Sequence, residues 1–132
     1  MTFVWQLSLV MLGSAIGGGL RFAVYEAYFR WTKISEFPIG TLTVNVAGCF
    51  LISLIAHVAL SSNLISTNTR LFLTTGIMGG LTTYSAFNFD LVEALKDGAY
   101  RAAILNTAVT LVLCLLAGLL GLAAGKAMVA SR

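Results

Sequence analysis

The chain has 132 residues, of which 58% are hydrophobic and 10% are charged, and its mean hydropathy is +0.92. Soluble domains carry about 25% charged residues, so this composition excludes an ordinary soluble domain and favours a protein embedded in a bilayer. The net charge is only +3 and the charged residues are scattered, so no nucleic-acid partner is expected. The length predicts a single domain over residues 1–132.

Four apolar segments follow one another along the chain, each long enough to cross a hydrocarbon core that takes about 20 residues. They cover residues 4–28, 39–60, 69–95 and 100–129, to within a few residues at each end. The polar stretches RWTKISEFP, SSNLISTN and KDGAY separate them. Pro38 suits the first turn of the second helix, where a missing N–H costs nothing. The pattern predicts an all-α membrane protein with four transmembrane helices.

An even number of helices places both chain termini on one side of the membrane. That side holds Arg70, Lys126 and Arg132, and the opposite side holds Arg30, Lys33, Lys96 and Arg101. The positive-inside rule acts on an asymmetry of basic residues, and here it is almost absent. We therefore expect insertion in both orientations, so that two inverted copies pair as an antiparallel, dual-topology dimer. The alternative is one fixed orientation set by other features.

Small residues recur at four-residue spacing in three of the segments, which allows helix backbones to approach closely. The pairs are Gly13 with Gly17, Gly76 with Gly80, and Gly121 with Gly125. Each pair is a weak signal alone, because glycine is common in membrane helices. Together they predict closely packed helices.

Polar residues inside the first two segments each have two interpretations. Arg21 lies where a charge costs at least about 2.5–3.5 kcal/mol, so it either faces protein or water, or the helix ends earlier and the side chain reaches the interface. Thr41 and Asn45 lie one turn apart. A buried amide needs partners, so Asn45 either bonds a neighbouring helix or lines an ion path, where its NH₂ donates to an anion.

The third segment contains GGLTTYSAFNF at residues 79–89. Gly79 and Gly80 each lower helix propensity by about 1 kcal/mol. Non-helical backbone at membrane depth persists only where protein or a water-filled cavity covers it, and unwound carbonyls there coordinate sodium. The stretch predicts a helix broken near its middle, at the doubled glycine, with an ion site at the break. The alternative is a continuous helix that packs closely at Gly79 and whose hydroxyls bond carbonyls four residues earlier.

Further polar and aromatic residues follow the break. Tyr84 and Phe87 share a helix face with Asn88 nearby. Rings at this spacing usually form core, yet the positive edge of a ring also faces an anion without trapping it. Asn106 and Thr110 form a polar stripe in the fourth segment that either lines a path or joins helices. No acid–base pair accompanies a nucleophile and no His/Cys cluster has metal spacing, so an enzyme is not expected.

The motifs GGGLR, GTLTVN, GIMGGLTTYSAF and DGAY, in this order, resemble the Fluc family of fluoride channels over essentially the whole chain. The resemblance implies passive, fluoride-selective export across the inner membrane of a prokaryote. It also implies an antiparallel homodimer in lipid, with a structural sodium ion at its centre held by the backbone carbonyls of Gly79 and Thr82 from both subunits.

The resemblance further assigns roles to side chains. Asn45 matches a pore-lining asparagine, and Phe87 matches the second of two phenylalanines whose ring edges face the anion. The implied fluoride pathway comprises Asn45, Tyr84, Ser85, Phe87, Asn88 and Thr110, with Arg21 and Asp90 at its vestibule. Tyr84 departs from the family's phenylalanine by adding a hydroxyl, which either donates to fluoride or narrows the path. Ala86 departs by removing a threonine hydroxyl.

Two other classes of protein fit a short four-helix chain. A small multidrug exporter, also of dual topology, requires a carboxylate embedded in its first helix, and the only candidate is Glu26, at the end of that helix. A non-transporting membrane subunit would use its polar residues only to hold helices together.

Overall fold

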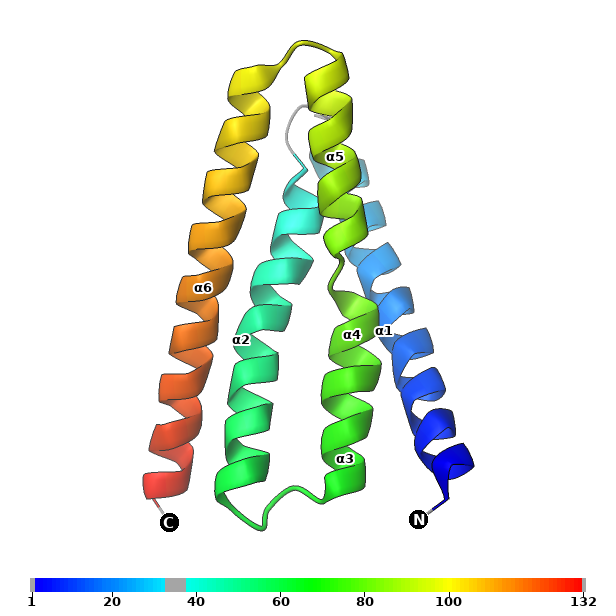
Figure 1. Cartoon of the computed structure of the whole chain (residues 1–132), viewed down its shortest axis with the longest axis vertical. Helices are drawn as coiled ribbons and strands as arrows, with labels where there is room; N and C mark the ends of the chain where they lie inside the picture. Colours follow the sequence, from blue (N-terminus) through cyan, green and yellow to red (C-terminus); the bar gives the residue numbers. More distant parts are fainter. Residues whose placement is uncertain (1, 33–37, 132) are drawn as a thin grey trace.

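In the computed structural model, which describes residues 2–32 and 38–131, every secondary-structure element is a helix (Figure 1). The elements are α1 (Phe3–Thr32), α2 (Ile39–Ser61), α3 (Thr67–Leu71), the π-helix η1 (Phe72–Met78), α4 (Gly79–Leu81), α5 (Tyr84–Lys96) and α6 (Tyr100–Ala130). The run from α3 to α5 is the third segment, so the predicted all-α fold with a broken third helix is confirmed for the described residues. α1 begins and α6 ends at the same end of the bundle (Figure 1).

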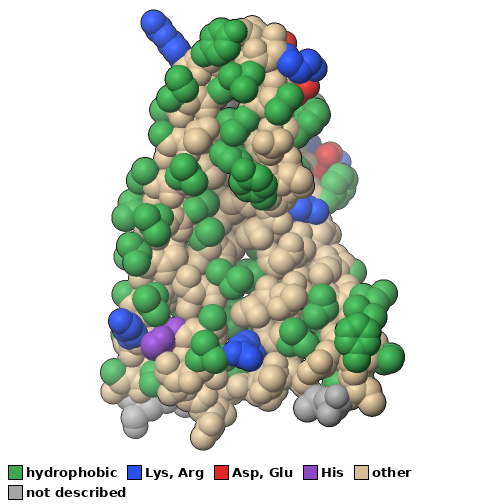
Figure 2. Space-filling view, viewed as in Figure 1, with side chains coloured by type: hydrophobic (Ala, Val, Ile, Leu, Met, Phe, Trp, Pro, Cys, Tyr) green, Lys and Arg blue, Asp and Glu red, His purple; other side chains and the backbone are tan. Residues whose placement is uncertain are grey.

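Three helices, α1, α2 and α6, are long and apolar enough to cross a membrane. Hydrophobic side chains cover the face shown in Figure 2, and Lys and Arg lie mostly toward its two ends. α1 continues to Thr32, so Arg21 lies about three turns before its end. The alternative that this helix ends earlier is therefore wrong, and the Arg21 side chain is half-buried on a continuing helix.

The helices pack as two pairs that lean together (Figure 1): α6 runs along α2, and α1 runs along η1 and α4. Glycine residues at the contact allow the backbone of α1 to lie close to that of η1 and α4. A Cβ on Gly13 would lie 2.7 Å from the Cα of Gly76, and a Cβ on Gly80 would lie 2.5 Å from the carbonyl oxygen of Ser14. The close packing predicted from the four-residue spacing of glycines is confirmed, and it occurs within one chain.

The third segment is unwound at Thr82 (φ −79°, ψ 156°) and Thr83 (φ −154°, ψ 116°). Gly79 remains helical (φ −63°, ψ −35°) and α4 includes Gly80. The prediction that the doubled glycine is the unwound point is therefore wrong by a few residues. The physical reason is that Gly80 serves the contact with α1, which outweighs its low helix propensity, whereas β-branched threonines accept extended backbone readily. The break lies near half the height of the bundle (Figure 1).

The contact between α1 and η1–α4 predicts unequal effects for two neighbouring glycines. A Cβ on Gly17 would collide with the carbonyl oxygen of Ile77, whereas a Cβ on Gly18 would meet nothing within 4 Å. We expect Gly17→Ala to lower the free energy of unfolding by about 1–3 kcal/mol through overpacking. Gly18→Ala is the matched control and should be neutral or stabilising by up to about 1 kcal/mol. Thermal unfolding in detergent measures both, and equal melting temperatures would contradict the assigned contact.

Candidate functional site

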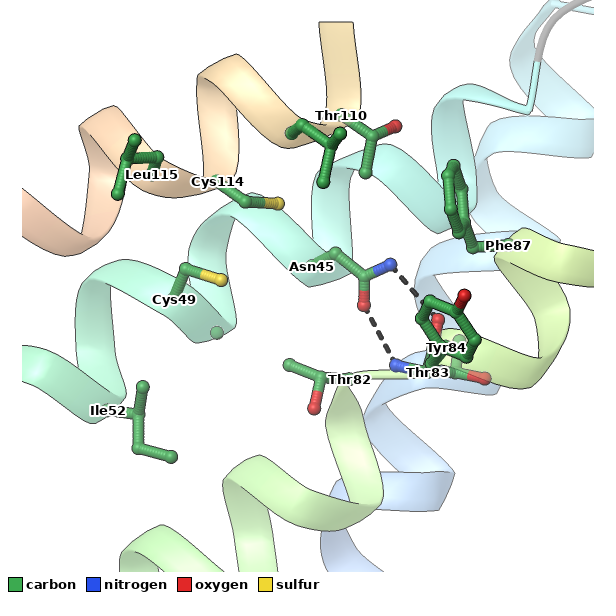
Figure 3. A pocket seen from close by; sticks show the side chains of 12 residues that line it. Asn45, Cys49, Ile52, Thr82, Thr83, Tyr84, Phe87, Thr110, Cys114 and Leu115 are labelled. Carbon is green, nitrogen blue, oxygen red and sulfur yellow. Dashed lines mark hydrogen bonds between the residues drawn. The ribbon is translucent and has the colours of Figure 1, made fainter. Parts of the chain in front are cut away.

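The unwound backbone is held by one side chain from another helix, Asn45 of α2 (Figure 3). Its Nδ2 donates to the carbonyl oxygen of Thr83 at 3.1 Å, and its Oδ1 accepts from the Thr83 N–H at 2.8 Å. Both residues are buried. Extended backbone that has lost helical partners must find others at membrane depth, and this amide satisfies a donor and an acceptor at once. The interhelical hydrogen bond considered for Asn45 is therefore present.

The same arrangement releases two carbonyls at the break. In a continuous helix the Gly79 carbonyl would accept from the N–H of Thr83, but that N–H is donated to Asn45. The Thr82 carbonyl would accept from the N–H of Ala86, but that N–H is donated to Thr83 Oγ1 at 3.1 Å, which caps α5. Gly79 is exposed, and a Cβ there would have no atom nearer than 4.0 Å. The carbonyls of Gly79 and Thr82 thus lose their helical donors at the break.

Beside the break, a groove of about 550 Å³ opens between α2, α6 and the start of α5 (Figure 3). Its polar lining includes Asn45, Thr82, Thr83 and Thr110, and its aromatic lining includes Tyr84 and Phe87. The remaining lining residues are Gly48, Cys49, Ile52, Leu111, Cys114 and Leu115. The structure therefore brings together four of the six side chains expected along the pathway.

The two rings differ in exposure. Phe87 is 7% exposed and Tyr84 is 78% exposed, with ring centroids 5.9 Å apart and planes tilted by 55°. Phe87 is therefore a fixed wall of the groove, whereas the Tyr84 ring stands at its rim.

Thr110 is buried and donates to Oδ1 of Asn106, one turn away, at 3.2 Å. Its hydroxyl hydrogen is thus engaged within α6.

Ser85 and Asn88, also expected along the pathway, do not line this groove and are exposed on α5. Ser85 Oγ lies 3.1 Å from Thr83 Oγ1, so it belongs to the polar cap of α5. Exposed polar groups in the middle of an apolar bundle require water or a second protein surface.

The two residues expected at a vestibule lie away from the groove. Asp90 Oδ2 accepts from Thr41 Oγ1 at 3.0 Å, and Thr41 Oγ1 lies 3.2 Å from the hydroxyl of Tyr25. This chain of hydrogen bonds joins α5, α2 and α1 at the end of the bundle opposite α3. Arg21 lies one turn from Tyr25 on α1.

Thr83 is the central residue of this site that sequence reasoning left out of the candidate list. Its backbone binds Asn45 and its hydroxyl caps α5. The sequence did indicate the capping role of Thr83, since a threonine that precedes a helix by one position is a preferred N-cap. Its partner Asn45 is 38 residues away, and no local spacing indicates that pairing.

The pairing predicts a large stability effect at Asn45. Asn45→Leu keeps a similar volume but leaves the Thr83 N–H and carbonyl unpaired, at about 1–3 kcal/mol for each buried group. We expect a clear fall in the melting temperature of the purified protein. Asn63→Leu is the control, because Asn63 lies in an exposed loop, and it should melt near the wild type. Equal melting temperatures for the two variants would show that the amide does not hold the break.

Comparison with known proteins agrees with this architecture. Residues 8–122 match the family described as CrcB-like protein, Camphor Resistance (CrcB). A protein of Sorangium cellulosum named Fluoride-specific ion channel FluC is 46% identical over 119 residues, which cover 90% of this chain and 93% of that protein. A protein of the same name from Parabacteroides distasonis is 40% identical over 121 residues, covering 92% of this chain and 93% of its own. The chain belongs to the CrcB-like family.

Proposed function

We propose that this protein is a fluoride-selective channel that lets fluoride leave a prokaryotic cell passively across its plasma membrane. The observation that carries the proposal is the groove itself, which gathers Asn45, Phe87 and Thr110 inside a bundle of membrane-crossing helices. The relatives named fluoride-specific ion channels align with about nine tenths of this chain and of their own length, which supports the proposal. The chain acts as a channel and not as an enzyme.

Fluoride is small and strongly hydrated, so a pore must replace its water with hydrogen-bond donors. An Asn amide has two N–H donors, and Asn45 uses one on Thr83, which leaves the other for an anion. The edge of the Phe87 ring carries partial positive charge and adds a weaker contact. Weak contacts of this kind favour conduction, because an ion must leave as well as enter.

The multidrug exporter is not favoured. Its mechanism needs a carboxylate free to exchange protons and cations, and Glu26 instead accepts a hydrogen bond from Arg30 Nε at 2.8 Å. The side chains of Arg30 and Glu26 are 74% and 42% exposed, so this pair belongs to the outer part of α1.

Asn45→Asp tests the pathway. A carboxylate about 4 Å from a passing anion repels it by about 4 kcal/mol at an effective dielectric constant near 20, so we expect fluoride efflux to fall at least ~100-fold. A fluoride electrode measures efflux from proteoliposomes, with chloride as the comparison ion. Asn63→Asp, the same change in an exposed loop, should conduct like the wild type.

Because Asn45 also holds the break, a second variant separates folding from conduction. Thr110→Val keeps the side-chain shape and removes the hydroxyl from the groove, far from the break along the chain. We expect reduced efflux with a smaller fall in melting temperature than in Asn45→Asp, because Thr110→Val removes one hydrogen bond, to Asn106, and none to the break. Normal efflux in both variants would remove the groove from the pathway.

We further propose that the working unit is an antiparallel homodimer with a structural sodium ion at its centre. Gly17 contacts the end of α4 and lies in the middle of α1, so the break lies near mid-depth of the membrane. A copy inverted about an axis in the membrane plane would then have its own break at the same depth. The exposed Gly79, Ser85 and Asn88 would face that copy in place of lipid.

In this arrangement the carbonyls of Gly79 and Thr82 from each copy would hold the ion. When bound, sodium supplies a fixed positive charge in a low-dielectric setting, which is felt more strongly there than in water. The protein would keep the two carbonyls available to the ion, since Asn45 and the Thr83 cap hold them out of helical hydrogen bonds.

The dimer should therefore depend on sodium and show both orientations. We expect the purified protein to elute as a dimer whose melting temperature falls when sodium is replaced by N-methylglucamine. In a Cys49→Ser/Cys114→Ser background, Asn63→Cys should react with a membrane-impermeant thiol reagent from both sides of the cell membrane. Labelling from one side only would refute dual topology, and sodium-independent melting would refute the ion site.

A further inference from the structure

The two cysteines of the chain line the same groove from adjacent helices. Cys49 of α2 and Cys114 of α6 both line it, together with Asn45 and Thr110 (Figure 3). Both are free thiols. They are 65 positions apart in a chain with only two cysteines, and although both line the groove, neither thiol has a role in the proposed fluoride path.

The close approach of the two helices fixes this pair. One turn beyond Cys114, a Cβ on Gly118 would lie 3.4 Å from Ser53 Oγ and 3.8 Å from the carbonyl oxygen of Cys49. Further along, a Cβ on Gly121 would collide with the carbonyl oxygen of Phe50. Backbones held this near leave the two thiols little room to separate, so they are preorganised as a pair.

The pair is also accessible. Both cysteines are only partly buried, and both line a second cavity of about 550 Å³ that continues from the groove toward His57 and Leu60. An ion that enters between α2 and α6 therefore reaches the two sulfurs from either cavity.

We propose that Cys49 and Cys114 form a two-coordinate binding site for soft, thiophilic cations such as Hg(II). Thiolate sulfur selects soft metals over hard ones, and Hg(II) binds two thiolates in line. Each thiol loses its proton and forms one bond to the metal, so one Hg(II) binds and two protons are released. No electron transfer is involved.

Occupation of this site obstructs the pathway, a consequence that rests on the proposed fluoride channel. The sulfurs share one groove with Asn45 and Phe87. A bound metal there narrows the groove and ties α2 to α6.

The test is a titration of the purified full-length protein with Hg(II) nitrate in chloride-free buffer. We expect one Hg(II) per chain, ultraviolet absorption from Hg–S bonds, two protons released, and loss of both thiols to a thiol reagent. Proteoliposomes should lose fluoride efflux at the same stoichiometry and regain it with excess dithiothreitol. Cys49→Ser and Cys114→Ser should each bind Hg(II) at least ~100-fold more weakly. In each variant the remaining thiolate lacks a second thiolate held near it at high effective concentration.

His57→Gln is the matched control, since His57 is the only histidine and lies at the far end of the second cavity. It should keep full Hg(II) binding. Wild-type binding in either single-cysteine variant, or no Hg–S absorption in the wild type, would overturn the site. Hg–S absorption with unchanged efflux would overturn the obstruction alone. A wild type that conducts no fluoride before Hg(II) is added would refute the channel and leave the absorption test intact.

Discussion

The site depends on one pairing, between the side-chain amide of Asn45 and the backbone of Thr83. Two residues of extended chain in the middle of an apolar bundle leave polar groups that water cannot reach. The amide matches a peptide group in having one donor edge and one acceptor, so it replaces the neighbouring helical turn that the break removes. The second contact is made by the Thr83 hydroxyl, which caps the start of α5 by accepting from the Ala86 N–H. Without these two contacts, a continuous helix would have a lower free energy than the broken one.

The glycines of α1 and of the third segment set where this pairing occurs. Gly13 and Gly17 allow η1 and α4 to lie directly on the backbone of α1, which holds α4 in place up to its last residue, Leu81. The chain then has to turn toward α2 within Thr82 and Thr83. A Cβ on Gly48 of α2 would collide with the Thr82 methyl group, so glycine is required on that side of the break too. Packing on both sides thus confines the unwound segment to two residues.

The sequence pattern was sufficient for the features that depend on local spacing. Four apolar segments and the glycine pairs follow from residue type and period, and the broken third helix follows from composition. The position of the break did not, because the low helix propensity of Gly80 is a local quantity, whereas its contact with Ser14 is tertiary. The π-helix η1 was not predicted either, since a shift of hydrogen-bond register leaves no signature in propensity. The resemblance to a known family supplied Asn45 and Phe87, and the structure supplied their partners.

The break gives the two halves of one segment opposite electrostatic character. α4 ends at the break with carbonyls that have lost their helical donors, whereas the 13-residue α5 begins there with its N-terminal amides. A helix N-terminus carries partial positive charge and a C-terminus partial negative charge. This polarity agrees with the proposal of a cation on the α4 side, at Gly79 and Thr82, and of an anion on the α5 side, beside Tyr84 and Phe87. A single interruption, fixed by one amide, thus suits both the proposed sodium site and the proposed fluoride path, and it does so without an ionised side chain in the groove that would hold the anion too tightly.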